Sequence, residues 1–336
     1  MYVRRKIRWS VIFAFSWHMV IFYAAYSSLI VFVFHYLEHK EINIAFPFLP
    51  MSVIGIAVAF YVGFKNSQSY ERFWEGRKIW GGIVNSSRTW AVQCLTYVSN
   101  LHATEKASDE ELKEIKTRLI YRHIAWINAL RIHLRKPSRF TIEKKGHVKT
   151  FHDTLHAAYH EAIDCFIIKD DLSSLLAYKN IPAQLLRKQG EEIQQLVDRG
   201  LVDDFRHMEF MHLIETLYEH QGKSERIKNT PFPRQYSYFS RLFMWIFILL
   251  LPLGLVGEFS QMGHGFTWLA IPFYILISWI FSTMESVGEY SEDPFDGHMN
   301  DVPMTALCRT IEIDLREMLG ETNIPEPLEP VQDVLL

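Results

Sequence analysis

Four apolar runs, arranged as two pairs, stand out along the chain. They are expected over residues 9–37, 46–64, 236–256 and 266–284. Each run approaches or exceeds the roughly 20 residues that an α-helix needs to cross about 30 Å of hydrocarbon. Short polar connections over residues 38–44 and 257–265 join the members of each pair. The pattern therefore predicts two transmembrane hairpins separated by a long polar segment.

The polar segment between the hairpins has the periodicity of amphipathic helices. Helices are expected over residues 105–134, 150–166, 181–197 and 202–220, with breaks at Gly190, Gly200 and Gly222. No stretch alternates apolar and polar residues as a strand would. After the last apolar run the chain is acidic, then helical, and it ends in a Pro-rich tail over residues 324–336 that is expected to be extended. The sequence thus predicts an all-α membrane protein with four transmembrane helices and a large cytoplasmic helical region.

These elements divide the chain into four expected regions. They are a transmembrane hairpin with the cytoplasmic extension of its second helix (1–88), a cytoplasmic helical region (89–234), a second hairpin (235–288), and a cytoplasmic helix with its tail (289–336). Lys and Arg gather on the cytoplasmic side of membrane helices. They flank the first hairpin at both ends, at Arg4, Arg5, Lys6 and Arg8 and again at Lys65, Arg72, Arg77, Lys78 and Arg88. Both termini are therefore expected in the cytoplasm.

The overall composition adds little about partners. The formal charge of −3 over 336 residues averages apolar ends with a polar centre. Cys94, Cys165 and Cys308 are odd in number and lack the spacing of a metal site, so we expect no disulfide framework and a reducing compartment. The first apolar run is too long for a cleavable signal peptide, and no small-residue cleavage site follows it.

The second apolar run carries two stripes of different chemistry. Ile56, Phe60 and Phe64 recur every four residues and share one side of a helix. Gly55, Ala59 and Gly63 form an adjacent stripe with the small-xxx-small spacing that lets membrane helices approach closely. By periodicity alone, both stripes could be ordinary packing surfaces. The large apolar stripe could also line a path.

The membrane runs lack the ionisable groups of a proton or substrate relay. Only His18 and His35 occur in the first run, and no ionisable residue occurs within the second or fourth. Coupled transport usually needs more, whereas hydrophobic constrictions can gate a passive pore by dewetting. Four helices alone cannot enclose a water-filled path, so conduction would require a ring of identical chains.

Motifs for enzyme chemistry are absent from the sequence. There is no phosphate-binding G-x-x-x-x-G-K-[ST] or G-x-G-x-x-G loop and no G-x-S-x-G elbow. His152, His156 and His160 share one helical face, and a metalloenzyme is the weaker alternative that they leave open. No enzyme, cofactor or metal is expected.

Carboxylates gather after the fourth run. They are Glu285, Glu289, Glu292, Asp293, Asp296 and Asp301. Oxygen-rich loops can bind calcium, but these residues lack the EF-hand spacing. We expect instead a solvated helix end whose carboxylates meet the basic segment at residues 72–88.

Two segments resemble the bestrophin family, in particular its bacterial members. They are SYERFWEGRKIWGGIVNSSR at residues 69–88, downstream of the I-x3-F-x3-F ladder, and EDPFDGHMNDVPMTALCRTIEIDLREMLGE at residues 292–321. The order of membrane runs and polar regions also agrees with that family. The resemblance implies a homopentameric ion channel in the membrane, with membrane lipid and small inorganic ions as its other partners and no nucleic acid. For a bacterial member it implies the inner membrane.

The resemblance also assigns roles to residues. It implies a hydrophobic pore neck at Ile56, Phe60 and Phe64, and a second constriction at the cytoplasmic exit, for which Leu201 or Ile181 is a candidate. The Gly55, Ala59, Gly63 stripe then becomes a helix-packing contact within or between subunits. Chloride is the ion implied by analogy, with sodium or potassium as an alternative. A membrane-anchored signalling or binding protein without conduction is the alternative from another class.

The calcium clasp of animal bestrophins is altered here. In those proteins an NPF motif precedes a run of consecutive carboxylates, but Asp293 stands in place of the Asn and residues 296–301 interrupt the run. Calcium activation is therefore not expected.

Overall fold

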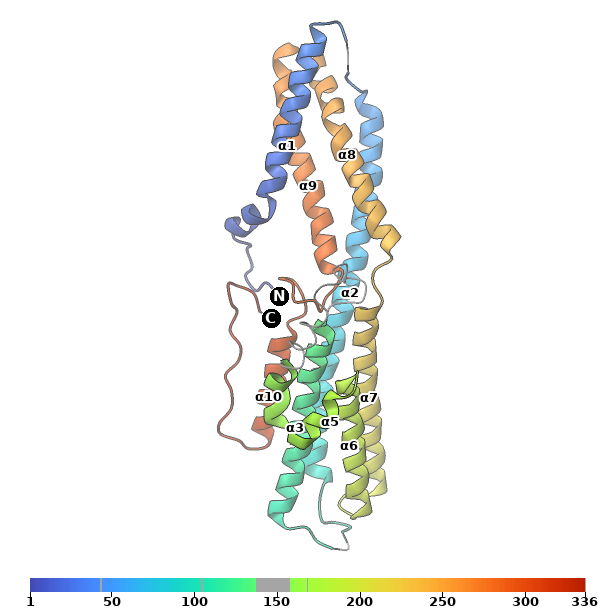
Figure 1. Ribbon diagram of the computed structural model, residues 1–336, viewed down its shortest axis with the longest axis vertical. Coiled ribbons are helices and arrows are strands. Elements are labelled where there is room, and N and C mark those ends of the chain that lie inside the picture. The colour runs from blue at the N-terminus through green and yellow to red at the C-terminus, as the bar shows by residue number, and fades with distance from the viewer. Residues whose placement is uncertain (43, 104, 137–157, 168, 336) are drawn as a thin grey trace. The chain divides into compact units, whose positions relative to one another are not determined.

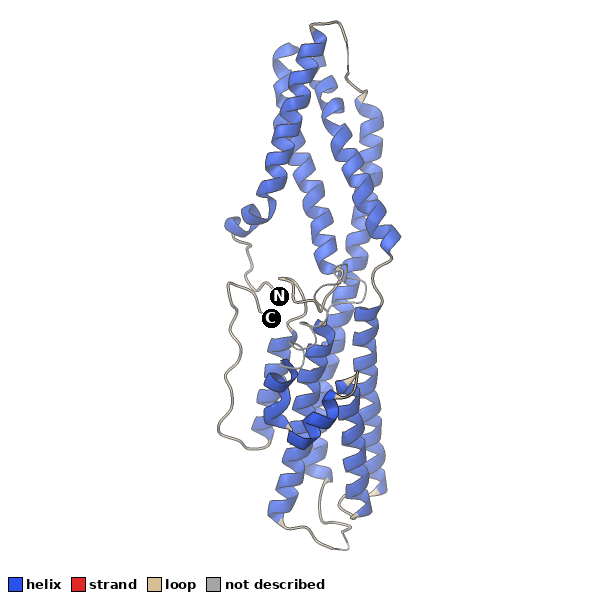
Figure 2. Ribbon diagram, in the orientation of Figure 1, coloured by secondary structure: helices blue, strands red, loops and turns tan. Residues whose placement is uncertain are grey.

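A computed structural model describes residues 1–42, 44–103, 105–136, 158–167 and 169–335. Its helices are α1 (Trp9–Glu38), α2 (Phe48–Tyr97), α3 (Asp109–Arg135), α5 (Lys169–Leu176), α6 (Ile181–Asp198), α7 (Asp204–Asn229), α8 (Arg234–Gln261), α9 (Ala270–Ser291) and α10 (Met304–Met318) (Figure 1). Short 3-10 turns are η1 (Asp164–Phe166) and η2 (His264–Leu269). Within the described residues no strand is present beyond isolated bridges (Figure 2). The predicted all-α fold is confirmed.

The predicted membrane spans are confirmed as helices of sufficient length and hydropathy. In the described part of the chain they are Trp9–Glu38, Phe48–Tyr97, Arg234–Gln261 and Gly265–Ser291, with mean hydropathy of 1.8, 1.7, 2.2 and 1.6 over their most apolar windows. The second helix does not end with its apolar run. It continues through the charged segment as one helix of 50 residues, because the polar stretch after the run contains neither proline nor a capping signal that would stop it.

The chain divides into two compact units, each built from separate stretches of sequence. The membrane unit holds residues 4–72 and 231–292, and therefore unites the two hairpins. The extramembrane unit holds residues 1–3, 73–230 and 293–336. Helix α2 contributes its first part to the membrane unit and its second part to the extramembrane unit.

Aromatic side chains form the centre of the extramembrane unit. Trp80, Trp90 and Trp126 are completely buried there. The indole of Trp90 donates to the carbonyl of Leu119 at 3.3 Å, and that of Trp126 donates to the side chain of Gln221 at 3.1 Å. Trp90 and Trp126 thus fill apolar volume while their N–H groups are satisfied, whereas the buried N–H of Trp80 has no partner among the described residues.

Polar side chains cap three helices of this unit. Ser108 accepts a hydrogen bond from the backbone of Glu111 at the start of α3, at 3.1 Å. Asn180 caps α6 and Asp203 caps α7 in the same way. Such caps satisfy amides that have no partner within the helix, and they fix where these helices begin.

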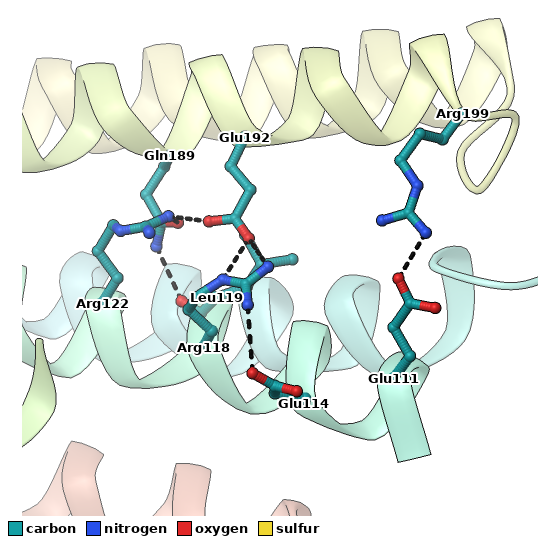
Figure 3. A network of polar contacts seen from close by, with 8 residues as sticks. All are labelled: Glu111, Glu114, Arg118, Leu119, Arg122, Gln189, Glu192 and Arg199. Atoms are coloured by element: carbon teal, nitrogen blue, oxygen red, sulfur yellow. Dashed lines mark hydrogen bonds and ion pairs between the residues drawn. The ribbon is translucent and has the colours of Figure 1, made fainter. Parts of the chain in front are cut away.

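A buried polar network joins α3 to α6 (Figure 3). Glu192 of α6 pairs with Arg118 and Arg122 of α3, with a distance of 2.7 Å from Arg118 Nη2 to Glu192 Oε1. Gln189 donates to the carbonyl of Leu119 at 2.8 Å and accepts from Arg122. The network holds two helices at a fixed register, because its charges lose their partners if either helix slides.

Two of the three expected glycine breaks are wrong. Gly190 lies inside α6 and Gly222 inside α7, and α7 extends to Asn229. A glycine inside a helix costs about 1 kcal/mol relative to alanine, and the buried face of each helix offsets this. Gly200 does end α6: its φ is +70°, and a Cβ there would lie 2.7 Å from the carbonyl oxygen of His102.

The core of the membrane unit joins α1, α2, α8 and α9. Its buried side chains include Tyr23, Val31, Val58, Val62 and Tyr274. The rings of Tyr23 and Tyr274 meet edge to face at 5.9 Å, which is a favoured aromatic geometry. These contacts decide which side of each helix is turned inward, and therefore which side of α2 is left uncovered.

Candidate functional site

Helix α2 presents two opposite faces within the membrane unit. Its buried positions are Met51, Gly55, Val58, Val62, Lys65 and Ser69. Ile56, Phe60 and Phe64 lie on the uncovered side and are 70%, 77% and 47% exposed. The sequence stripe therefore becomes a row of large apolar side chains that its own unit does not bury.

The lower exposure of Phe64 has a local cause. Its ring lies 6.4 Å from that of Tyr236 at the start of α8, measured between ring centroids. Tyr236 also stacks on Tyr61 of α2 at 6.2 Å. The start of α8 thus supports the last residue of the stripe and leaves the first two open.

The stripe of small residues divides between two environments. A Cβ at Gly55 would lie 2.9 Å from Phe247 of α8, so Gly55 permits a close contact within the unit. Ala59 is half-exposed, and Gly63 is exposed with nothing within 4 Å of a Cβ. An apolar hollow of about 290 Å³ adjoins them, lined by Ile54, Ala57, Val58, Tyr61, Phe243 and Ile246. Of the three residues predicted to pack against a neighbouring helix, only Gly55 therefore has such a close contact within the described part of one chain.

A buried ion pair lies immediately beyond the stripe, and the sequence reading missed it. Lys65 Nζ lies 2.6 Å from Glu285 Oε1 of α9, and the two side chains are only 1% and 4% exposed. Ser240 of α8 donates to the other carboxylate oxygen at 2.8 Å. The sequence pattern places Lys65 in the basic flank of the first hairpin and Glu285 in the solvated acidic patch.

Helical phase was the signal that could have located the pair. Lys65 follows Val58 and Val62 on the inward side of α2. Glu285 follows Ser278 and Ser282 on the inward side of α9, where all three are buried. Two opposite charges on two inward faces predict a buried pair, because an unpaired buried charge is very costly.

Several carboxylates after the fourth span have partners outside the expected basic segment. Glu289 pairs with Arg241, and Asp296 pairs with Lys228. Asp301 accepts from the backbone amides of residues 297 and 298 at 2.7 and 2.9 Å. From residues 72–88, Arg72 reaches this segment by donating to the main-chain carbonyl of residue 292 at 3.0 Å. The patch is therefore a set of helix-end contacts distributed over several elements.

The alternative histidine site gains no support in the described part of the chain. His160 is exposed, while His152 and His156 lie outside the described residues. No group of three His, Cys, Asp or Glu side chains that could hold a metal occurs among the residues that the structure describes. Cys94, Cys165 and Cys308, all described, form no disulfide.

The two candidates for a cytoplasmic constriction are buried. Leu201 and Ile181 both belong to the core of the extramembrane unit, so neither side chain can line a path in this conformation, and the assignment is corrected here. Four residues after Leu201, Phe205 is 83% exposed in the first turn of α7. The Ser99 amide donates to the Leu201 carbonyl at 3.0 Å and ties the Leu201 main chain to the segment that follows α2, a contact that local sequence could not show.

Four apolar helices and a separate helical unit define this chain as an α-helical membrane protein. Comparison with known families makes that class specific. The sequence pattern described as "Bacterial/Fungal Bestrophin protein" matches residues 3–317. The chain belongs to the bestrophin family, so the resemblance found in the sequence is confirmed and the protein is not an enzyme.

Individual relatives agree over nearly the whole length. The chain is 27% identical over 306 residues to the "Voltage-dependent anion channel-forming protein YneE" of Escherichia coli K12, covering 91% of this chain and 87% of that protein. It is 27% identical to "Voltage-dependent anion channel-forming protein RSc3414" of Ralstonia nicotianae, over 82% of this chain and 78% of that one. The crystal structure of a bacterial bestrophin homologue from Klebsiella pneumoniae is similar with a TM-score of 0.74 at 25% identity, over 90% and 97% of the two chains.

Proposed function

We propose that this chain forms a passive ion channel in which several copies of α2 surround one pore, with Ile56, Phe60 and Phe64 as its hydrophobic neck. The observation that carries the proposal is the uncovered stripe of these three side chains on a membrane helix. A hydrophobic constriction can gate ions by expelling water. The printed names of the relatives, voltage-dependent anion channel-forming proteins, support this class of activity.

The stripe alone does not make a pore, so the proposal includes self-association. The helices of one chain cannot enclose a hydrated path with every backbone group satisfied. A closed ring of identical chains places the same stripe at one axis, and the family resemblance gives the number as five. The other partners are then membrane lipid around the ring and the permeating ion within it.

We propose small monovalent anions, chloride first, as the permeating ions. The charge of Lys65 beside the neck is balanced by Glu285, so this pair adds no net charge that would attract cations. Positive ring edges of phenylalanine favour anions weakly. A sodium- or potassium-selective channel is the competing outcome, and reversal potentials under asymmetric salt distinguish the two directly.

The test of the neck is ion flux through purified protein in liposomes. Phe60→Ala removes the most exposed ring of the neck. It should therefore raise flux by about tenfold, which corresponds to a barrier lowered by about 1.4 kcal/mol. The matched control is Phe13→Ala, an exposed phenylalanine of α1, which should leave flux unchanged. Unchanged flux in Ile56→Ala, Phe60→Ala and Phe64→Ala combined would refute the neck. A detergent-solubilised monomer without flux would favour a membrane-anchored binding protein.

We also propose Phe205 in place of Leu201 and Ile181 as the side chain of a second constriction. Its ring is uncovered at the start of α7, and the Asp203 cap holds that first turn in place. Phe205→Ala should change the relative permeability of large and small anions. The neighbouring exposed Met208→Ala is the control, and identical permeability ratios in both variants and wild type would contradict this role.

The proposed setting is a bacterial inner membrane with both termini in the cytoplasm. An even number of spans places the ends on one side, and the basic flanks favour the cytoplasmic side. No cofactor is proposed, and calcium activation is not, because the clasp motif is interrupted at residues 296–301. Equal flux in calcium and in chelator is the expected result, and a calcium-dependent current would contradict it.

A further inference from the structure

The ion pair between Lys65 and Glu285 is a candidate for a role beyond stability, because of its position. Lys65 directly follows Phe64, the last residue of the exposed stripe. Its side chain lies about 100° further round the helix and is buried. One carboxylate oxygen of Glu285 accepts from Lys65, and the other accepts from Ser240. Three helices therefore meet at one carboxylate.

Because they are buried, the charged groups of Lys65 and Glu285 need each other as partners. A charged side chain in an apolar environment is tolerated only with its partner in hydrogen-bonding range. Rotation of α2 about its axis would withdraw Lys65 from Glu285 and leave both charges buried without partners. The pair therefore restricts the rotation of α2 more sharply than apolar contacts do, since those can slide with small losses.

The next residue strengthens the same contact by an uncharged route. Asn66 donates from its side chain to the main-chain carbonyl of Met284 on α9, at 2.9 Å. A Cβ at Gly288 would lie only 2.0 Å from Asn66 Oδ1. The absence of a side chain at Gly288 lets α2 approach α9 at the level of the ion pair.

Helical geometry connects the pair to the stripe. Successive residues are about 100° apart around a helix, so an inward Lys65 requires Phe64 to lie well away from α9. Phe60 and Ile56 share the direction of Phe64 because they lie one and two turns earlier. Fixing one inward side chain fixes the facing of all three outward ones.

We propose that Lys65, Glu285 and Ser240 are positioning residues that set the rotation of α2 and so aim the neck side chains at the pore. The inference rests on the proposed function of the neck. The three residues do not line the ion path. Substituting them changes flux only because it changes the orientation of the phenylalanine rings.

The first experiment measures flux in liposomes for Lys65→Met and Glu285→Gln. Each should raise flux several-fold, because rings turned off the axis no longer close the neck. Lys65→Arg, which keeps the charge, should restore flux toward wild type. The matched control is Lys223→Met, which breaks an exposed Lys–Glu pair on α7 and should leave flux unchanged.

A second readout follows the facing of the stripe itself. In a Cys165→Ser background, Phe60→Cys should be modified rapidly by a water-soluble, charged thiol reagent that blocks flux. The same cysteine combined with Lys65→Met should react much more slowly, since the position has turned away from the pore. A loss of stability alone would not slow this reaction in correctly assembled protein.

The outcomes separate this inference from the neck proposal. If Phe60→Ala changes flux while Lys65→Met and Glu285→Gln have wild-type flux and unaltered Phe60→Cys reactivity, the positioning role is refuted and the neck stands. If Phe60→Ala itself has no effect, the neck fails. If Lys65→Met does not assemble, flux and Phe60→Cys reactivity are measured in Ser240→Ala and Gly288→Ala instead, because these two variants keep both charges. Wild-type flux and reactivity in those two variants would likewise overturn the inference.

Discussion

Removing the carboxylate of Glu192 should destabilise the extramembrane unit far more than removing an exposed carboxylate between the same helices. Glu192 is 9% exposed and pairs with Arg122, which is 7% exposed, and with Arg118 (Figure 3). In Glu192→Gln the Arg122 guanidinium stays buried without an anion. Breaking a buried pair in this way costs about 3–5 kcal/mol.

The expected shift in melting temperature follows from the size of the unit. For about 150–250 residues, 1 kcal/mol corresponds to about 2–4 °C in Tm, so Glu192→Gln should lower Tm by roughly 6–20 °C. Glu111→Gln is the matched control. Its partner Arg199 and Glu111 itself are 46% and 42% exposed, and such pairs contribute about 0–1 kcal/mol.

Thermal unfolding of the full chain in detergent, followed by tryptophan fluorescence, measures the difference. Trp80, Trp90 and Trp126 are fully buried in this unit and report its opening. Equal Tm shifts in the two variants would refute the reasoning. In addition, Arg122→Met combined with Glu192→Met should be more stable than Glu192→Gln, because apolar side chains of similar volume leave no buried charge unpaired.

Three further predictions concern the same unit. Burial lowers the pKa of His123 from its usual 6.5 to about 3; the unfolded chain therefore binds a proton that the folded one does not, and stability present above pH 6.5 should fall as the pH drops toward 3. The Tm of His123→Gln, measured by thermal unfolding at several pH values, should change less across this range than the Tm of the wild type. Gly200→Ala places a side chain at φ +70°, a strain of about 1–2 kcal/mol, and its Cβ would also lie 2.7 Å from the His102 carbonyl oxygen; it should lower Tm by more than the roughly 2–8 °C that the strain alone predicts, in the same assay. Maleimide should label Cys165 first in folded protein, and mass spectrometry of the labelled peptides checks this, because the other two cysteines are buried.

The spans and their faces were accessible to sequence reasoning because they rest on local patterns. Apolar length located α1, α2, α8 and α9, and the four-residue spacing put Ile56, Phe60 and Phe64 on one side of α2. The start of α6 after Asn180 was predicted correctly, whereas the helix expected from residue 105 begins only at Asp109, after the Ser108 cap. These features depend on residues within one or two turns of each other.

The remainder depends on partners that are distant in sequence. Lys65 and Glu285 are separated by 220 positions. To predict their pairing, one would need to know which residues of α2 and α9 face inward and that these two helices are neighbours. Leu201 packs in a core built from distant elements, and its main chain is hydrogen-bonded to the segment after α2. Gly190 and Gly222 stay helical because tertiary packing outweighs their low helix propensity.

The exposure of Phe64 next to the buried Lys65 has a consequence for how α2 can vary in length. One inserted residue between Phe60 and Lys65 would turn everything that follows by about 100°. Lys65 would then lose Glu285, and the Phe64 ring would leave the line of Phe60 and Ile56. Insertions in the connection between α1 and α2, whose described residues 39–42 and 44–47 are not helical, disturb no such phase. The geometry of this part of α2 therefore constrains the number of its residues as strictly as their identity.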